Sequence, residues 1–159
     1  MEWLGSPIVY IEDGGFSRRM RELKSRYYSY LSARFHYLHM AQGNYREYLR
    51  GGEVWLKKYF YVLRPLLAVK WIDELRGPVP TPFLTLVDGL LGSGLVREEI
   101  LNLIETKRAG SELGWGARNP VISRFIEEEF ARTQTVNGGG PPESPPIGEL
   151  NAFFQSLLE

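Results

Sequence analysis

Cations and aromatic rings concentrated in one part of the chain are the residues best suited to binding chemistry. Residues 18–76 contain 13 Lys or Arg and 5 Asp or Glu, whereas the rest of the 159-residue chain contains 6 and 14. The same stretch holds eight of the nine tyrosines. Cations can meet the phosphates of a single-stranded nucleic acid or a nucleotide while the rings stack on its bases. Alternatively, these cations only solvate helix faces, and the tyrosines fill the core.

Side chains arranged for catalysis are not recognisable. The chain has no cysteine, and His36 and His39 favour a structural or hydrogen-bonding role over metal binding. A two-metal site commonly uses Asp-x-Asp, but none of Asp13, Asp73 and Asp88 is followed two residues later by Asp or Glu. The sequence also has no P-loop, no Rossmann glycine fingerprint for dinucleotide binding and no Gly-x-Ser-x-Gly motif. We therefore expect neither a common type of autonomous active site nor a metal site.

The positions of the cations and rings depend on one long helix, predicted over residues 54–75. Lys57, Tyr61 and Arg64 form a polar face at i, i+4 and i+7. Pro65 lies inside the helix and should kink its axis, because it cannot donate to the preceding turn. The apolar residues form a continuous stripe: Leu56, Phe60, Leu63, Leu67 and Trp71. We expect this helix to be central and buried on most sides.

Shorter helices should surround the long one. Their predicted ranges are 17–31, 32–50, 83–91, 96–109 and 120–132. Asn119 and Pro120 suit the N-cap and the first position of the last of these, and the three glutamates at 127–129 should be solvated. Residues 7–11 are β-prone and predict one short strand or an extended lead-in. The predicted fold is mainly α, a helical bundle around one long kinked central helix.

Composition divides the chain into three predicted parts. Residues 1–132 form the helical domain. Residues 133–146 contain a run of three glycines and four prolines with almost no apolar residue, which is typical of a flexible linker. Residues 147–159 predict an amphipathic C-terminal helix that either docks on the core or binds a partner.

A recognisable string occupies residues 57–72, which read KKYFYVLRPLLAVKWI. It resembles the hallmark helix of the YcgL-like predicted nucleotidyltransferases. That family is a branch of the DNA polymerase beta superfamily with members associated with bacterial and phage RNA repair. Residues 2–10 (EWLGSPIVY) and 36–41 (HYLHMA, followed by NY) are similar to two other family segments. The resemblance covers residues 2–132, and the long-helix string is its most specific part.

The resemblance implies a catalytic half that this chain lacks. Enzymes of the family are expected to have an N-terminal palm with a Gly-Ser turn and an Asp-x-Asp pair that holds Mg²⁺ and a nucleoside triphosphate. The three Gly-Ser pairs here, beginning at Gly5, Gly92 and Gly110, do not lead to such aspartates. We therefore expect a truncation, a split-gene product or an excised domain, one that binds substrate and does not catalyse nucleotidyl transfer by itself.

The matching motifs also imply which residues would touch a nucleotide or RNA. In such enzymes the helical half would act as a C-terminal substrate-binding domain that closes the nucleotide cleft. Lysines would meet phosphate as point charges, arginine would clamp it with a planar fork, tyrosines would stack on a base, and histidine would hydrogen-bond base or ribose. The candidate residues are Lys57, Lys58, Arg64, His36, Tyr37 and Tyr61, with Tyr45 as a further stacking candidate. For each, the alternative is a role in helix packing.

Two functions from different classes therefore stay open. The first is the nucleotide- or RNA-binding helical portion of a nucleotidyltransferase-like protein, with a missing or separately encoded catalytic domain as its partner. The second is a non-catalytic adaptor that captures a protein through residues 147–159. The sequence has no apolar run of membrane-spanning length and no signal-peptide core, so we expect no membrane association and a cytoplasmic location.

Overall fold

The computed structural model describes residues 2–6, 8–12, 14–110, 113–135 and 146–158. Helices dominate this part of the chain, so the prediction of a mainly helical fold is confirmed. The elements are a 3₁₀ turn η1 (Glu2–Gly5), α1 (Gly14–Tyr27), α2 (Tyr30–Tyr48), β1 (Glu53–Trp55), α3 (Lys58–Asp73), α4 (Phe83–Leu90), α5 (Leu95–Arg108), β2 (Trp115–Ala117), α6 (Pro120–Thr135) and α7 (Gly148–Gln155). None of the helices described is both long and apolar enough to cross a membrane.

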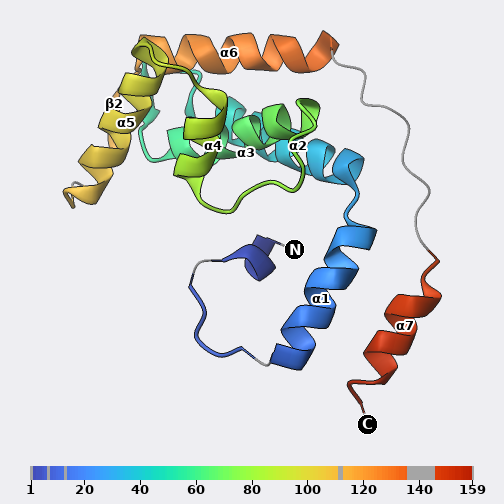
Figure 1. Ribbon diagram of the computed structural model, residues 1–159. Helices are drawn as coiled ribbons and strands as arrows, with labels where there is room; N and C mark the ends of the chain where they lie inside the picture. The colour runs from blue at the N-terminus through green and yellow to red at the C-terminus, as the bar shows by residue number, and fades with distance from the viewer. Residues whose placement is uncertain (1, 7, 13, 111–112, 136–145, 159) are drawn as a thin grey trace.

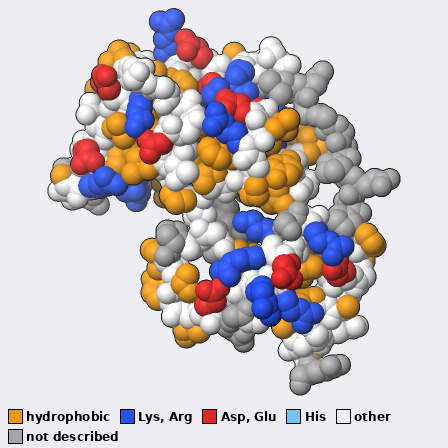
Figure 2. Space-filling model, viewed as in Figure 1, with side chains coloured by type: hydrophobic (Ala, Val, Ile, Leu, Met, Phe, Trp, Pro, Cys, Tyr) orange, Lys and Arg blue, Asp and Glu red, His pale blue; other side chains and the backbone are white. Residues whose placement is uncertain are grey.

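The helices gather into two lobes (Figure 1). The core lobe consists of α2 to α6, and α6 runs along one side of it. The terminal lobe consists of the N-terminal segment, α1 and α7, although α7 comes last in the chain. Figure 2 shows a hollowed waist where the two lobes meet. A ligand at this waist could therefore contact segments from both lobes.

The central helix α3 is buried on most sides, as predicted. Its buried residues include Val62, Leu66 and Val69, which belong to one hydrophobic cluster with residues of α2, α4, α5 and α6. Pro65 lies within α3, and the helix continues through it. The fully buried Tyr59 hydroxyl lies 3.0 Å from the Ser123 hydroxyl on α6. Burial of this kind leaves few positions on α3 that can face a ligand.

The long helix begins later than predicted, because its expected first residues form a strand. Strand β1 pairs antiparallel with β2, and Val54 opposite Gly116 is fully buried. A Cβ atom at Gly116 would lie 2.9 Å from a methyl carbon of Leu56, so only glycine fits there without a shift. Local periodicity could not reveal a strand whose partner lies some sixty residues away.

Helix α6 begins as predicted. The Asn119 side-chain oxygen accepts hydrogen bonds from the backbone N–H groups of Val121 and Ile122, both at 3.0 Å. This is an N-cap, which satisfies donors that the first helical turn leaves open. The Asn119 amide also donates to Glu99 on α5 at 2.7 Å, so the cap ties two helices together. The helix extends to Thr135, past the predicted end.

A buried ion-pair network joins α2, α3 and α6. One oxygen of Asp73 accepts from Arg34 Nε at 2.6 Å, and the other accepts from Arg132 at 2.8 Å. Glu129 accepts from Arg132 at 2.7 Å and lies 3.7 Å from Lys70. The prediction that the glutamates at 127–129 are all solvated is therefore wrong for Glu129. Its carboxylate is buried beside Arg132 and Lys70, whose positive charges stabilise it there.

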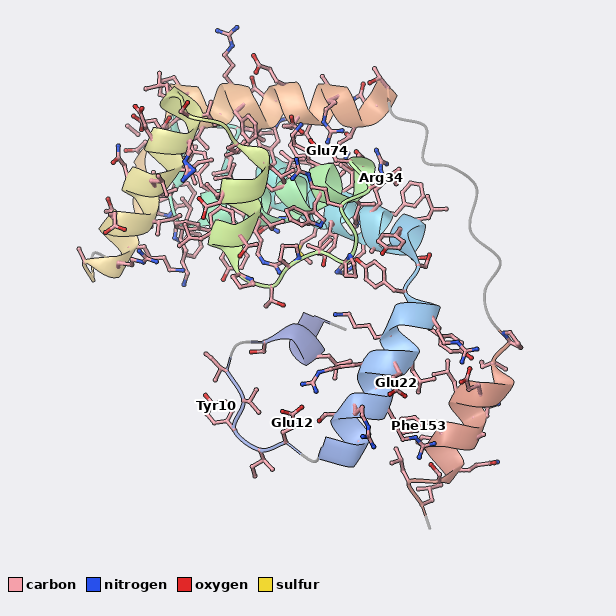
Figure 3. The ribbon with its side chains drawn as sticks, viewed as in Figure 1. Tyr10, Glu12, Glu22, Arg34, Glu74 and Phe153 are labelled. Carbon is pink, nitrogen blue, oxygen red and sulfur yellow. The ribbon has the colours of Figure 1, made fainter. Side chains whose placement is uncertain are left out.

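The C-terminal helix docks on α1 and not on the main hydrophobic cluster. Phe153 is buried, stacks on Phe16 with ring centroids 5.9 Å apart, and lies under the guanidinium of Arg19 (Figure 3). Arg26 also pairs with Glu149 at 2.5 Å. The predicted strand or lead-in at 7–11 forms neither helix nor strand over its described residues 8–11. Residues 136–145 of the predicted linker lie outside the described part.

Removal of the Asp73 carboxylate should destabilise the fold strongly. The Asp73 and Arg34 side chains are 7% and 6% exposed, so Asp73→Ala would remove the buried carboxylate that Arg34 and Arg132 share. We expect a loss of about 3–5 kcal/mol in the free energy of unfolding, measured by urea denaturation. The matched control is Asp88→Ala, because Asp88 pairs with Arg97 while 59% exposed and should cost less than about 1 kcal/mol. Equal losses for the two variants would contradict this.

Substitution of Phe153 should release α7 and leave the core lobe folded. A helix of this length is marginal in water without a docking partner. We expect the amides of α7 in Phe153→Ala to exchange hydrogen at close to unfolded rates, while those of α3 stay protected, as read by mass spectrometry. The neighbouring Phe154→Ala serves as control, since Phe154 is 63% exposed. Unchanged α7 protection in Phe153→Ala would show that the docking contact lies elsewhere.

Candidate nucleic-acid interface

A cleft of about 340 Å³ opens between α1, α2, α3 and the connector that follows α3. We refer to it as the α1–α3 cleft. Its cations are Lys24 from α1 and Arg64 from α3, and its rings are those of Tyr28, His36 and Tyr37. Among the described residues that line it, none is Asp or Glu. The lining thus offers positive charge and aromatic surface together, which suits a phosphate attached to a base.

Packing of α2 on α3 determines which side chains reach this cleft. Ser29 caps α2, with its hydroxyl accepting from the Ser32 backbone N–H at 3.2 Å. Tyr37 is buried against the core, while the adjacent His36 is exposed, with ring centroids 5.8 Å apart. Across the cleft, Arg64 donates to the Thr81 carbonyl at 3.3 Å. The structure therefore brings the predicted site residue Arg64 to the same cleft as the predicted pair His36 and Tyr37.

A second cleft, of about 610 Å³, also includes Arg64 in its lining. We refer to it as the α3–α5 cleft, because α3, α4 and α5 line it. Phe60 and Phe83 meet edge to face at a centroid distance of 5.9 Å, and Lys107 Nζ lies 4.9 Å from the Phe60 ring. Arg108 completes the basic side of the cleft and pairs with Glu105 at 3.0 Å. Arg64 is thus shared by the two clefts.

Lys58 and Tyr61 lie in a separate aromatic cluster. The Lys58 ammonium is 4.0 Å from the Tyr48 ring centroid, 4.8 Å from that of Tyr61 and 5.6 Å from that of Trp55. It also donates to the Asn44 side-chain oxygen at 3.3 Å. These contacts hold Lys58 by cation–π attraction within the protein.

Lys57, Lys58 and Arg64, three of the candidate phosphate-binding residues, do not line one cleft in the structure. Lys57 is exposed and, like Lys58, lines neither cleft. The reason is geometric: Lys57 precedes the first residue of α3, and Lys58 turns toward the strand and α2. Of these three residues, Arg64 lines the two clefts.

Tyr45 is committed to helix packing and reaches neither cleft. Its ring meets Phe130 at 5.3 Å, and its hydroxyl donates to Glu127 at 2.6 Å. The hydrogen bond from Tyr45, together with the Arg118 guanidinium, holds the pKa of the Glu127 carboxyl below its usual value. This cluster joins α2 to α6.

Several residues of the two clefts were not predicted from the sequence. Lys24 belongs to the basic stretch, but no pattern indicated that α1 would face Arg64. Lys107, Arg108 and Phe83 lie outside that stretch, and Lys107 matches the family only as a late lysine, with no indication that it would share a cleft with Arg64. Their roles become visible only once α3 is seen to be surrounded by α1, α4 and α5.

The described residues do not fit a magnesium site. Mg²⁺ prefers oxygen ligands from carboxylates, with near-octahedral geometry. No group of three or more His, Cys, Asp or Glu suited to a metal gathers in the part of the chain that the structure describes. Asp73 and Asp88 are both engaged by arginines, and Asp13 is outside the described residues.

Comparisons with known proteins agree with the resemblance seen in the sequence. The chain is 41% identical over 160 residues to "Uncharacterized protein YcgL" of Bacillus subtilis (strain 168), a match that covers all of this chain. The chain spans 62% of the length of that relative. No solved structure matches this chain. The model of the RlaP family, described as the RNA repair pathway DNA polymerase beta family, matches residues 1–156. The predicted relationship is thereby confirmed, and the chain belongs to the RNA repair pathway DNA polymerase beta family.

Proposed function

We propose that this chain binds RNA or a nucleotide through the α1–α3 cleft, as the helical binding portion of a nucleotidyltransferase-like protein. The observation that carries the proposal is the convergence of Arg64, Lys24 and His36 around two tyrosine rings. Arg64 offers a planar fork of donors that matches phosphate geometry, and Lys24 adds a point charge from the opposite wall. His36, exposed at the cleft, can hydrogen-bond a base or a ribose.

The described residues of the cleft supply charge and aromatic surface without carboxylates, and this combination favours a phosphate-bearing ligand. Most protein contacts to nucleic acids go to the phosphate and sugar, and base edges or faces add the rest. Tyr28 and Tyr37 form part of the wall, so a base next to a bound phosphate would find ring surface. A nucleotide at the end of a single strand fits this description.

For the complete protein, the proposed reaction is transfer of a nucleotidyl group from a nucleoside triphosphate to an RNA end or another acceptor. This proposal rests on family membership. The Mg²⁺ that such a reaction needs would have to be held by residues other than those described. The described residues would contribute binding of the nucleotide or the acceptor, in a protein that works in the cytoplasm.

The alternative of a protein-binding adaptor has less support. That function would use the C-terminal helix to capture a partner, but Phe153 on α7 is already buried against α1. Arg26 and Glu149 add an ion pair to the same contact. Partner capture through this face would first require α7 to leave α1.

Loss of the cleft cations should weaken RNA binding and reduce its salt dependence. We expect Arg64→Ala to weaken binding of a five-nucleotide single-stranded RNA by about tenfold or more, because a charged hydrogen bond to phosphate is lost. Lys24→Ala should have a smaller effect in the same direction. For each, the slope of log affinity against log salt should flatten by about 0.7 for one lost phosphate contact. Calorimetry at several salt concentrations measures both quantities.

The matched control is Arg124→Ala, because Arg124 is 82% exposed on α6 and lines neither cleft. It should leave both affinity and slope unchanged. The proposal would be refuted if Arg64→Ala and Arg124→Ala behaved alike, or if wild-type chain showed no salt-dependent affinity for RNA. Tight capture of a protein that is lost on deleting residues 147–159 would favour the adaptor instead.

A further inference from the structure

The α3–α5 cleft is a second site with the chemistry of a nucleotide pocket. Phe60, Phe83 and Ile104 provide an apolar wall, and Lys107 and Arg108 place positive charge beside it. No acid is among the described residues that line it, although Glu105 pairs with Arg108 on the exposed side. The volume of about 610 Å³ lies within the range of small-molecule sites.

Arg64 connects this cleft to the α1–α3 cleft. Its side chain lines both, and the connector after α3 borders both, with Pro78 in the first cleft and Pro82 in the second. The Thr81 carbonyl between these two prolines accepts a hydrogen bond from Arg64 at 3.3 Å. This contact helps to hold the guanidinium where the linings of the two clefts meet.

A ligand that fills both clefts would pass Arg64 at its middle, where a negative charge is favoured. Each of its ends would meet ring surface, which favours a flat or apolar group. Two consecutive nucleotides have this character, since a phosphodiester joins two nucleosides. We propose that the two clefts are adjoining subsites for a dinucleotide step of single-stranded RNA. The linking phosphate lies on Arg64, one nucleoside occupies the α1–α3 cleft, and the base of the next lies against Phe60 and Phe83. This inference rests on the proposed function of the α1–α3 cleft.

The charges around the second cleft support this orientation. Lys107 Nζ lies 4.9 Å from the Phe60 ring centroid, so a base packed beside that ring would have a cation at its edge. Arg108 lies at the exposed rim, where the next phosphate of a longer strand would pass. Ring stacking with nearby cations is the usual means by which proteins hold unpaired bases without reading sequence. Both subsites should therefore tolerate any base.

The test compares ligands that fill one or both clefts, using the whole 159-residue chain. Uridine 5′-monophosphate and the trinucleotide UpUpU, both unlabelled, are titrated by calorimetry at low salt. We expect wild-type chain to bind the trinucleotide at least tenfold more tightly than the mononucleotide. Lys107→Ala and Phe83→Leu should reduce that advantage to threefold or less. Arg64→Ala should weaken the binding of both ligands.

Lys57→Ala is the matched lysine control, because Lys57 is exposed and lines neither cleft. It should preserve the trinucleotide advantage. Lys107 is also exposed, so its variant should stay folded even if Phe83→Leu does not. An unchanged trinucleotide advantage in Lys107→Ala would overturn the two-subsite inference while leaving the proposed function intact, provided that Arg64→Ala still weakens RNA binding. Equal wild-type affinity for the two ligands would overturn it as well.

Loss of the Arg64 effect on every ligand would refute both the inference and the proposed function. Binding of an acidic, tyrosine-containing peptide that depends on Lys107 and Phe83, without any RNA binding, would assign the α3–α5 cleft to a protein partner. That result would overturn the dinucleotide inference directly.

Discussion

The carboxylate of Asp73 is the interaction on which the arrangement of the site depends. It accepts from Arg34 on α2 and Arg132 on α6, so three helices meet at one buried anion. Pairing of Arg34 with Asp73 therefore helps to hold α2 against α3. The α1–α3 cleft takes His36 from α2 and Arg64 from α3, so its lining depends on the packing of these two helices.

Much of the positive charge in residues 18–76 is engaged by partners within the fold. Arg21 pairs with Glu12 and Arg26 with Glu149, while Arg34 and Lys70 join the buried network. Lys58 is held among three rings. Some of the partner acids lie outside the basic stretch, which is why a strongly basic segment occurs in a chain of zero net charge. The number of basic residues thus overstates how much of the surface is basic. In the two clefts that Arg64 lines, cations and aromatic rings lie together.

Much of the fold could be predicted from the sequence because its signals are local. The apolar stripe of α3 and the Asn119 cap determine helices without reference to distant residues. Strand β1, the burial of Glu129 and the docking of Phe153 on α1 could not be predicted, because each depends on a partner far along the chain. The residues of the candidate site also fall into a predictable and an unpredictable group. Arg64, His36 and Tyr37 came from motifs, whereas Lys24 and Lys107 required knowledge of which helices surround α3.

The most direct test of this account is a crystal structure of the chain bound to a short single-stranded RNA. The account places one phosphate within hydrogen-bond distance of the Arg64 guanidinium, about 3 Å, with one nucleoside in each of the two clefts. A strand that instead runs over Lys57 and the aromatic cluster around Lys58, with Arg64 bonded to protein alone, would contradict it. In that case the cleft residues would be part of the packing and the binding surface would lie at the strand pair.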